Sequence, residues 1–278
     1  MMDSPTPQEY ARLLVEPAYD ANKYTRGRLL VIAGSAQYGG AAVLAAHAAA
    51  RSGAGYVTLA TTHTVAAISQ AHLLTVPVLG FDEDREGCIA YEAYETLCAR
   101  LDHVDAVLIG SGLGRSDSVA HLVRDLVQKS PVPMVLDADG LNAFCGHTDD
   151  FAQAVAPLIL APHAGELQRL GTLEQLVSLC RVVVAKGPTT TISEGSRMVR
   201  DDTGPSALAT AGTGDVLAGI IGALLCQGLE PFDAAMLGVH IHSTAALLAC
   251  ETLTSYCMMA TDVIEYLPRA LQKIRGVG

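Results

Sequence analysis

The chain has 278 residues and a formal net charge of −11, and half of its residues are hydrophobic although only 5% are aromatic. The negative charge argues against a surface for nucleic acid or anionic membranes, because both depend on patches of Lys and Arg. A core made of small and branched aliphatic side chains suits helices packed closely on a parallel sheet.

No membrane span, secretory signal or disulfide framework is expected. Val216–Cys226 is among the longest apolar runs, but it contains glycines and is well short of the ~20 residues that cross a bilayer. Residues 1–9 are polar and acidic, unlike a signal peptide. The seven cysteines form no C-x-x-C pair, so we expect reduced thiols rather than a zinc site. The chain is therefore expected to be soluble and cytoplasmic, and to bind neither membrane nor nucleic acid.

Short runs of β-branched and aliphatic residues recur in the chain, and helical patterns lie between most of them. This alternation predicts an α/β fold with a mainly parallel sheet and helices on both faces. The expected strands cover residues 28–33, 55–60, 106–109, 132–136, 158–160 and 182–185. The expected helices between them cover residues 40–52, 91–100, 118–128 and 165–170, the last continuing to 179.

The segment that follows residue 188 has a different pattern. Two β-rich pieces, 189–193 and 197–200, flank the turn Glu194-Gly195, which predicts a β-hairpin at the sheet edge. Beyond Gly212 the pattern becomes helical, near 213–227, 232–251 and 261–274. No linker-like stretch, low-complexity tract or repeat interrupts the chain, so a single domain over residues 1–278 is expected.

The candidate site comprises the residues that follow the strands, because ligands of doubly wound sheets bind at the carboxyl ends of strands. Residues 34–41 form a turn of small residues. Such a turn would let a ligand approach the backbone, but a tight strand-to-helix connection without a ligand would look the same, and the two interpretations have equal weight. Residues 110–114 have the spacing G-x-G-x-G, which differs from the dinucleotide fingerprint G-x-G-x-x-G and comes late in the chain. A standard NAD-binding fold is therefore not expected.

Carboxylates and an amide follow the strand at 132–136. Asp137, Asp139 and Asn142 lie within six residues of one another. One of the two carboxylates is expected to cap the next helix. The same three side chains could equally contact a hydrated metal ion or a phosphate.

The next two strands also end in charged or polar residues. His163 and Glu166 are three residues apart at a helix start and so share a face, where His163 could cap the helix and Glu166 could favour its first turn electrostatically. Lys186, one of four lysines, ends the strand at 182–185, and its flexible ammonium suits a phosphate. We expect His163, Glu166 and Lys186 to belong to a functional site.

The segment 209–222 gives the clearest functional signal. Gly212 and Gly214 remove side chains around N–H groups that a helix start leaves unpaired, which creates an anion site at the positive end of the helix dipole. Asp215 lies in the first turn, where any Asp gains ~0.3–1 kcal/mol from the dipole. Stability alone does not explain the two glycines, so we expect Asp215 to be a catalytic carboxylate facing a nucleotide or a similar phosphorylated ligand.

Taken in order, these turns resemble the ribokinase-like superfamily and, within it, the ADP/ATP-dependent NAD(P)H-hydrate dehydratases. The resemblance implies a ribokinase-like three-layer αβα fold with a mainly parallel central sheet and an edge β-hairpin. It also implies one dehydratase domain over residues 1–278, without the epimerase domain that is fused in some relatives. The matching blocks span residues 26–35, 110–114, 136–142, 162–166, 185–187 and 209–222.

The activity implied by the resemblance is metabolite repair by a carbon–oxygen lyase. ADP would phosphorylate the 6-hydroxyl of (6S)-NADH or NADPH hydrate, and elimination of phosphate would restore NAD(P)H, with AMP and phosphate as the other products. Mg²⁺ would assist. ADP is favoured over ATP because the chain carries this domain alone.

Helices rich in Ala and Leu near the C-terminus would supply the interface of a homo-oligomer, with a tetramer as one option.

The resemblance also implies roles for individual residues. Asp215 would be the base, beside an anion hole of Gly212, Thr213 and Gly214. Glu166 matches the superfamily's acidic magnesium motif and would orient Mg²⁺ through water. The hydrate would contact Ala41, Gly112, His163 and Asp215, and the nucleotide would contact Lys186, Gly187, Pro188, Thr189, Thr190 and Gly214.

The chain departs from the family pattern in two places. Ser111 stands where a proline is common, and residues 204–207 (Gly-Pro-Ser-Ala) replace a usual Gly-Asn-Pro-Gly approach to the anion hole. Two other functions remain open. One is a small-molecule kinase of the same superfamily, such as one acting on hydroxyethylthiazole, which keeps the phosphate ester as product. The other is a nucleotide-binding regulator without turnover.

Overall fold

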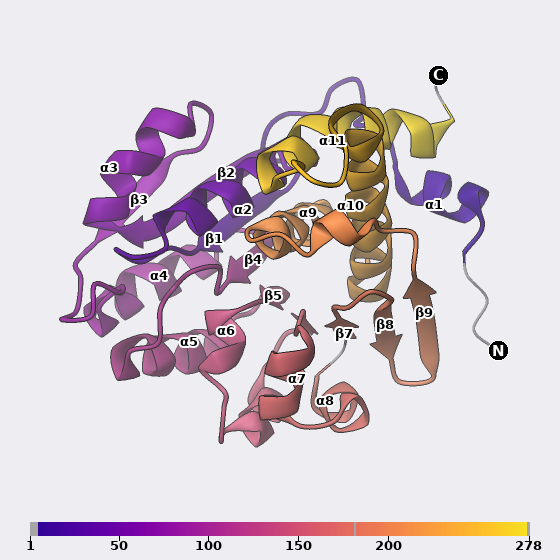
Figure 1. The fold of residues 1–278 in the computed structure, drawn as a ribbon. Coiled ribbons are helices and arrows are strands. Elements are labelled where there is room, and N and C mark those ends of the chain that lie inside the picture. Colours follow the sequence, from indigo (N-terminus) through magenta and orange to yellow (C-terminus); the bar gives the residue numbers. More distant parts are fainter. Residues whose placement is uncertain (1–4, 181, 277–278) are drawn as a thin grey trace.

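A computed structural model describes residues 5–180 and 182–276. Within them nine strands form one sheet in the order β3-β2-β1-β4-β5-β6-β7-β8-β9. All pairs from β3 to β7 are parallel, and the β7–β8 and β8–β9 pairs are antiparallel. Helices cover both faces of the sheet (Figure 1). The expected three-layer fold with a mainly parallel sheet is confirmed.

The strands match the expected runs closely, with one addition. β3 was not predicted, because its four half-exposed residues lie at the sheet edge and include a glycine. The hairpin β8–β9 lies at the opposite edge, as expected. The strands are β1 (Arg28–Ile32), β2 (Tyr56–Thr62), β3 (Val78–Phe81), β4 (Ala106–Ile109), β5 (Met134–Leu136), β6 (Leu158–Leu160), β7 (Val182–Ala185), β8 (Thr190–Glu194) and β9 (Arg197–Asp201).

The helices differ from expectation in two ways: α1, α3 and α6 are additions, and after β6 two short helices replace one. Gly171, with φ of 134°, ends the first, and the Thr172 side chain caps the second. The α-helices are α1 (Pro7–Leu13), α2 (Gly39–Arg51), α3 (His63–His72), α4 (Tyr94–Leu101), α5 (Asp117–Lys129), α6 (Asp139–Asn142), α7 (Ala164–Leu170), α8 (Leu173–Leu179), α9 (Thr213–Cys226), α10 (Pro231–Leu253) and α11 (Ala260–Arg275). Three 3₁₀ turns are η1 (Tyr91–Ala93), η2 (Thr148–Gln153) and η3 (Ser206–Leu208).

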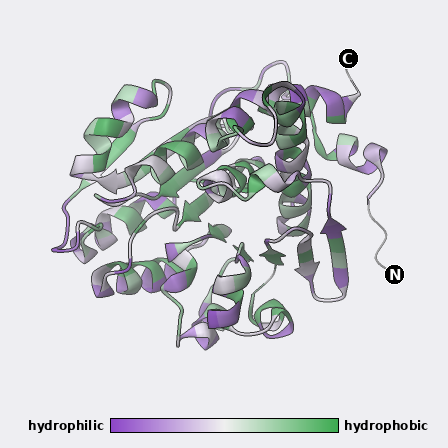
Figure 2. Ribbon diagram, viewed as in Figure 1, coloured by the Kyte–Doolittle hydropathy of each residue, from purple (hydrophilic) through white to green (hydrophobic). Residues whose placement is uncertain are grey.

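The core has two parts, one on each face of the sheet. On one face, Leu29 and Val31 of β1 belong to a cluster that includes α2, α9, α10 and α11. On the other, Leu30 and Ile32 belong to a cluster that includes α4, α5 and α8. Because strand side chains alternate between faces, a parallel strand covered on both sides must be apolar throughout. Figure 2 shows the hydrophobic strands in the middle of the fold.

The helix α10 is the one helix, among residues 5–180 and 182–276, that is long and apolar enough to cross a membrane. In its most apolar window, 78% is buried inside the fold. The shorter apolar run Val216–Cys226 lies in α9. Burial of this kind is typical of a core helix.

The helices α2 and α9 pack closely because of their small residues. A Cβ at Gly219 of α9 would come within 2.3 Å of the carbonyl oxygen of Ala45 in α2. The two backbones therefore approach each other directly. This contact holds α9 against the centre of the sheet and so fixes where α9 begins.

Candidate active site

The start of α9 lies open at the carboxyl ends of the strands. Its N-cap residue is Gly212, which has a φ of 90° and provides no side-chain cap. The Thr213 hydroxyl donates hydrogen bonds to the carbonyls of Leu208 and Thr210, at 2.7 and 2.9 Å, and so fixes the preceding turn. In the part of the chain that the structure describes, the backbone N–H groups of Gly214 and Asp215 have no acceptor. These are two of the donors that a helix start leaves for an anion.

Asp215 is partly buried beside these N–H groups. Burial raises its pKa to about 7, and the nearby carboxylate of Asp137 adds to the rise, whereas the Ser111 hydroxyl and the Lys186 ammonium oppose it. The Ser111 hydroxyl oxygen is buried and makes no hydrogen bond to any of the described residues. A carboxyl group with a pKa near neutral pH is suited to accept a proton.

An ion pair between Lys186 and Asp137 joins the ends of β7 and β5. Asp137 is almost fully buried, and the Lys186 side chain is 18% exposed. Burial lowers the pKa of Lys186, but the charges of Asp137, Glu166 and Asp215 outweigh it and leave the pKa raised. Lys186 is therefore a fixed positive charge, and its ammonium would lie 3.5 Å from a Cβ at Gly214. The structure thus brings the Lys186 ammonium to the open start of α9.

The start of α7 is closed by its own side chains. His163 is the N-cap, and its Nδ1 accepts hydrogen bonds from the backbone N–H groups of Gly165 at 2.9 Å and Glu166 at 3.3 Å. One oxygen of the buried Glu166 accepts from the His163 N–H at 2.8 Å, and the other lies 3.3 Å from His163 Nε2. The capping interpretation of His163 is therefore confirmed. The charge of Glu166 still acts on Lys186.

The expectation that Asp137 or Asp139 caps α6 is wrong. The N-cap is Ala138, with φ of 48° and no side-chain hydrogen bond. Asp137 is occupied by Lys186. Asp139 turns to the loop after β4, where it accepts from the Gly114 N–H and Arg115 Nε, both at 3.0 Å. Both carboxylates join distant segments, and neither caps α6.

Ala41 and Gly112, both expected to contact substrate, lie next to each other. A Cβ at Gly112, whose φ is 63°, would come within 2.8 Å of the Ala41 Cβ. The turns that carry them follow β1 and β4, which are paired in the sheet. Ser35 also donates to the Gly112 carbonyl at 2.9 Å. The small-residue turn after β1 and the glycine turn after β4 thus form one wall.

The turn between β7 and β8 contains the expected nucleotide residues. Gly187, Pro188 and Thr189 are exposed, and Thr190 donates to the Gly187 carbonyl at 3.4 Å. The Lys186 N–H donates to Pro162 at 2.8 Å, next to the start of α7. Three exposed residues therefore follow Lys186 directly, and its ammonium lies near Gly214.

His242 of α10 is a buried polar residue that the sequence does not single out. It is 6% exposed, and its Nε2 has no partner among the described residues. Burial lowers its pKa to about 4, against an opposing effect of the Thr213 backbone. His242 is therefore neutral. In a long apolar helix such a histidine gives no local signal that separates it from the core.

The donor set of the site fits a hydrated magnesium ion better than a closed metal cage. No group of three or more His, Cys, Asp or Glu side chains arranged to hold a metal is found among the described residues. Asp139 already accepts three hydrogen bonds, and Asp137 is paired with Lys186. Mg²⁺ typically keeps several waters and takes one or two carboxylates together with phosphate oxygens. Glu166, acting through water, is consistent with that pattern.

The family model described as NAD(P)H-hydrate dehydratase matches residues 29–269. The chain is 41% identical over 274 residues to a bifunctional NAD(P)H-hydrate repair enzyme from Salinibacter ruber, covering 93% of the chain and 51% of that protein. It is 30% identical over 278 residues to an ADP-dependent (S)-NAD(P)H-hydrate dehydratase from Listeria monocytogenes, covering 96% of the chain and 95% of the relative. The chain spans about half the length of the bifunctional relatives.

Similarity extends to a solved structure. The ADP/ATP-dependent NAD(P)H-hydrate dehydratase from Bacillus subtilis, co-crystallised with ATP/Mg²⁺, superposes with a TM-score of 0.83 at 28% identity, covering 99% of this chain and 100% of that one. The expected ribokinase-like fold is confirmed.

Proposed function

The chain belongs to the NAD(P)H-hydrate dehydratase family, and on that premise we propose that it dehydrates (6S)-NAD(P)H hydrate with ADP as co-substrate. The observation that carries this proposal is Asp215, a carboxyl group with a pKa of about 7 at an open helix start. The reaction belongs to the carbon–oxygen lyases. Its products are NAD(P)H, AMP and phosphate.

The first step is phosphoryl transfer to the 6-hydroxyl of the hydrate. Asp215 takes the hydroxyl proton while the oxygen attacks the terminal phosphorus of ADP, and the bond from that phosphorus to AMP breaks. The raised pKa of Asp215 supports this role, because a base is most effective when its pKa lies near the working pH.

The second step is elimination. The bond from the ring carbon to the phosphorylated oxygen breaks, phosphate leaves, and a proton is lost from the adjacent ring carbon to form the double bond. A phosphate ester is a far better leaving group than hydroxide, and this explains why a nucleotide is spent on a dehydration.

The open start of α9 and Lys186 would stabilise the transferring phosphoryl group. The unpaired N–H groups of Gly214 and Asp215 and the positive dipole end of α9 favour negative charge. The Lys186 ammonium adds a full charge beside Gly214. In phosphoryl transfer, positioning and electrostatics of this kind supply most of the catalysis.

We assign the two ligands to opposite sides of Asp215. ADP, or ATP as an alternative donor, would lie along Lys186, Gly187, Pro188, Thr189 and Thr190, with Gly214. The hydrate would lie on the other side, against Ala41 and Gly112, and would reach across to His163, which lies beside Lys186 in the sheet. The turns that carry Gly112 and Lys186 follow β4 and β7, which are three strand positions apart.

Mg²⁺ would supply positive charge between the nucleotide phosphates and the protein when it is bound. Glu166 would hold it through water, since one of its oxygens is already used at the start of α7.

We further propose one dehydratase domain that acts in the cytoplasm as a homo-oligomer and binds neither membrane nor nucleic acid.

The proposal is tested by supplying NADH hydrate with ADP and Mg²⁺ and following the absorbance of the dihydronicotinamide. Recovery of that absorbance with release of AMP is expected. No recovery, together with phosphorylation of hydroxyethylthiazole, would favour the superfamily kinase. A regulator without turnover would give neither reaction while still binding nucleotide.

A further inference from the structure

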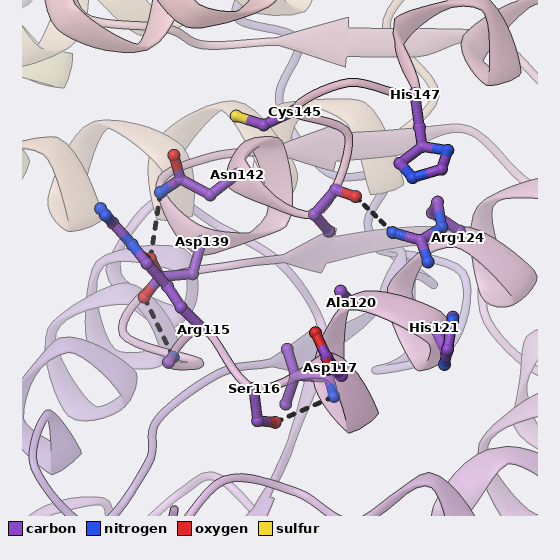
Figure 3. Close-up of a pocket in the computed structure, with 13 residues that line it drawn as sticks. Arg115, Ser116, Asp117, Ala120, His121, Arg124, Asp139, Asn142, Cys145 and His147 are labelled. Carbon is purple, nitrogen blue, oxygen red and sulfur yellow. Dashed lines mark hydrogen bonds and ion pairs between the residues drawn. The ribbon is translucent and has the colours of Figure 1, made fainter.

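A cavity of about 450 Å³ lies between the loop after β4, α5 and α6 (Figure 3). Its lining includes four basic side chains, Arg115, His121, Arg124 and His147. The chain as a whole has 18 Lys and Arg against 29 Asp and Glu. The lining also includes the carboxylates Asp117 and Asp139, so this α5–α6 pocket has basic side chains that outnumber its acidic ones by four to two, in a protein with the opposite balance.

Arg115 is held in place with part of its guanidinium free. Its Nε donates to Asp139 at 3.0 Å, and Asp139 also accepts from Gly114 and from the Asn142 amide at 3.1 Å. Among the described residues, the two terminal nitrogens of Arg115 have no partner. The Asp139 side chain is 11% exposed, whereas that of Arg115 is 67% exposed. A positioned arginine fork suits a phosphate.

The other basic groups lie on the opposite side of the α5–α6 pocket. Figure 3 shows His121, Arg124 and His147 together, away from Arg115 and Asn142. Arg124 donates to the Ala143 carbonyl at 2.7 Å and so joins α5 to α6. His121 and Arg124 are three residues apart on α5 and share a face. The pocket thus has polar groups at both ends, which suits an extended ligand with more than one phosphate or hydroxyl group.

The α5–α6 pocket borders the candidate active site on the substrate side. Arg115 follows Gly112 by three residues, a reach of at most about 11 Å. Asp139 contributes to the raised pKa of Asp215, and Glu166 contributes to that of Arg115. The turn expected to bind ADP follows β7, three strands or about 14 Å from β4. The pocket therefore adjoins the place of the hydrate rather than that of ADP.

We propose that the α5–α6 pocket binds the phosphorylated adenosine half of the dinucleotide substrate, with Arg115 contacting a phosphate. This inference rests on the proposed function and adds a specificity determinant to it. The hydrated ring would lie at Asp215, and the rest of the dinucleotide would pass the glycine turn after β4 into the pocket.

The test compares the variant R115Q with the wild type on two substrates that share the hydrated ring. One is NADPH hydrate, and the other is the hydrate of reduced nicotinamide mononucleotide, which lacks the adenosine half. The ratio of kcat/KM for the dinucleotide to that for the mononucleotide is expected to fall about tenfold, as for one charge-assisted hydrogen bond. R115K should recover part of the ratio. The control R12Q removes an exposed arginine of α1 and should keep the wild-type ratio.

Three results would overturn the inference. They are an unchanged ratio in R115Q, an equal loss on both substrates, and a rise in the KM for ADP alone. A binding titration of NADPH, followed by its own fluorescence, needs no turnover and should show about tenfold weaker binding to R115Q. Failure of the wild type to convert any hydrate would count against the proposed function, whereas equal NADPH binding by wild type and R115Q would count against the pocket.

Discussion

The helices α7 and α9 both begin at the carboxyl edge of the sheet, but they treat their first N–H groups in opposite ways. At α7, His163 and Glu166 cap each other's backbone N–H groups. At α9, the N-cap is a glycine without a side chain, and no acceptor within the described residues meets the N–H groups of Gly214 and Asp215. The comparison separates a helix start built for stability from one left open for an anion.

The open start of α9 carries costs that the closed start of α7 avoids. Gly212 provides no capping side chain, Asp215 is kept from its ordinary pKa by burial, and two backbone N–H donors lack partners among the residues that the structure describes. Sites that depart from locally stable choices are commonly functional. The predictions below test this difference, beginning with the largest effect.

The substitution D215N should lower kcat by about 10²–10⁴, the contribution of one acid–base group, with little change in KM. It removes the base and keeps the shape of the side chain. Steady-state assays with NADH hydrate and ADP measure the effect. The matched control D233N changes another first-turn aspartate, at the start of α10, and should keep wild-type turnover.

The pH profile of kcat/KM should rise with pH through about 7, because Asp215 must lose its proton to act as base. The substitution D137N should move this inflection to lower pH, since Asp137 contributes to the rise of the Asp215 pKa. A profile that is flat between pH 6 and 8 in the wild type would exclude Asp215 as the titrating base.

The substitution G212A should reduce both stability and activity. A non-glycine residue in the left-handed region costs about 1–2 kcal/mol, and the new Cβ would also come within 2.7 Å of Leu44. The control G276A carries the same type of penalty, with a φ of 71° at the end of α11 and nothing within 4 Å. The midpoint temperature of thermal unfolding should fall in both variants, but kcat/KM should fall in G212A alone.

The smallest effect is expected at the closed start of α7. Loss of the cap in H163A should lower the free energy of unfolding by about 0.5–2 kcal/mol. H163N retains a capping side chain and should recover most of that loss. Urea denaturation at neutral pH measures both variants. Equal stability of H163A and the wild type would contradict the assignment of this helix start as a structural cap.

Much of the fold could be predicted because burial on both faces leaves a simple pattern. Leu29–Ile32 are fully buried and uniformly apolar, so the strand is visible in the sequence. The edge strand Val78–Phe81 is half-exposed and contains a glycine, and it was missed. The local hydrophobic pattern therefore identifies strands that are buried on both faces, but it does not identify a half-exposed strand at the edge of the sheet.

The site could be predicted in part, because its turns are punctuated by glycines and charges. The pairing of its carboxylates could not. Asp137 meets Lys186, 49 residues away, and Asp139 meets Arg115, 24 residues away. The order of the strands in the sheet brings such distant residues together. A capping rule considers only residues close in sequence, so it cannot predict these pairs. The same reason explains why the α5–α6 pocket was not foreseen.

The central claim is that α9 begins with a carboxyl group tuned by burial to act as a base. The most direct test is a carbon NMR titration of the aspartate side chains in the free protein, with the Asp215 signal assigned by its loss in D215N. A pKa of about 7 is predicted, coinciding with the kinetic inflection. A value near the ordinary ~4 of an exposed aspartate would contradict the account.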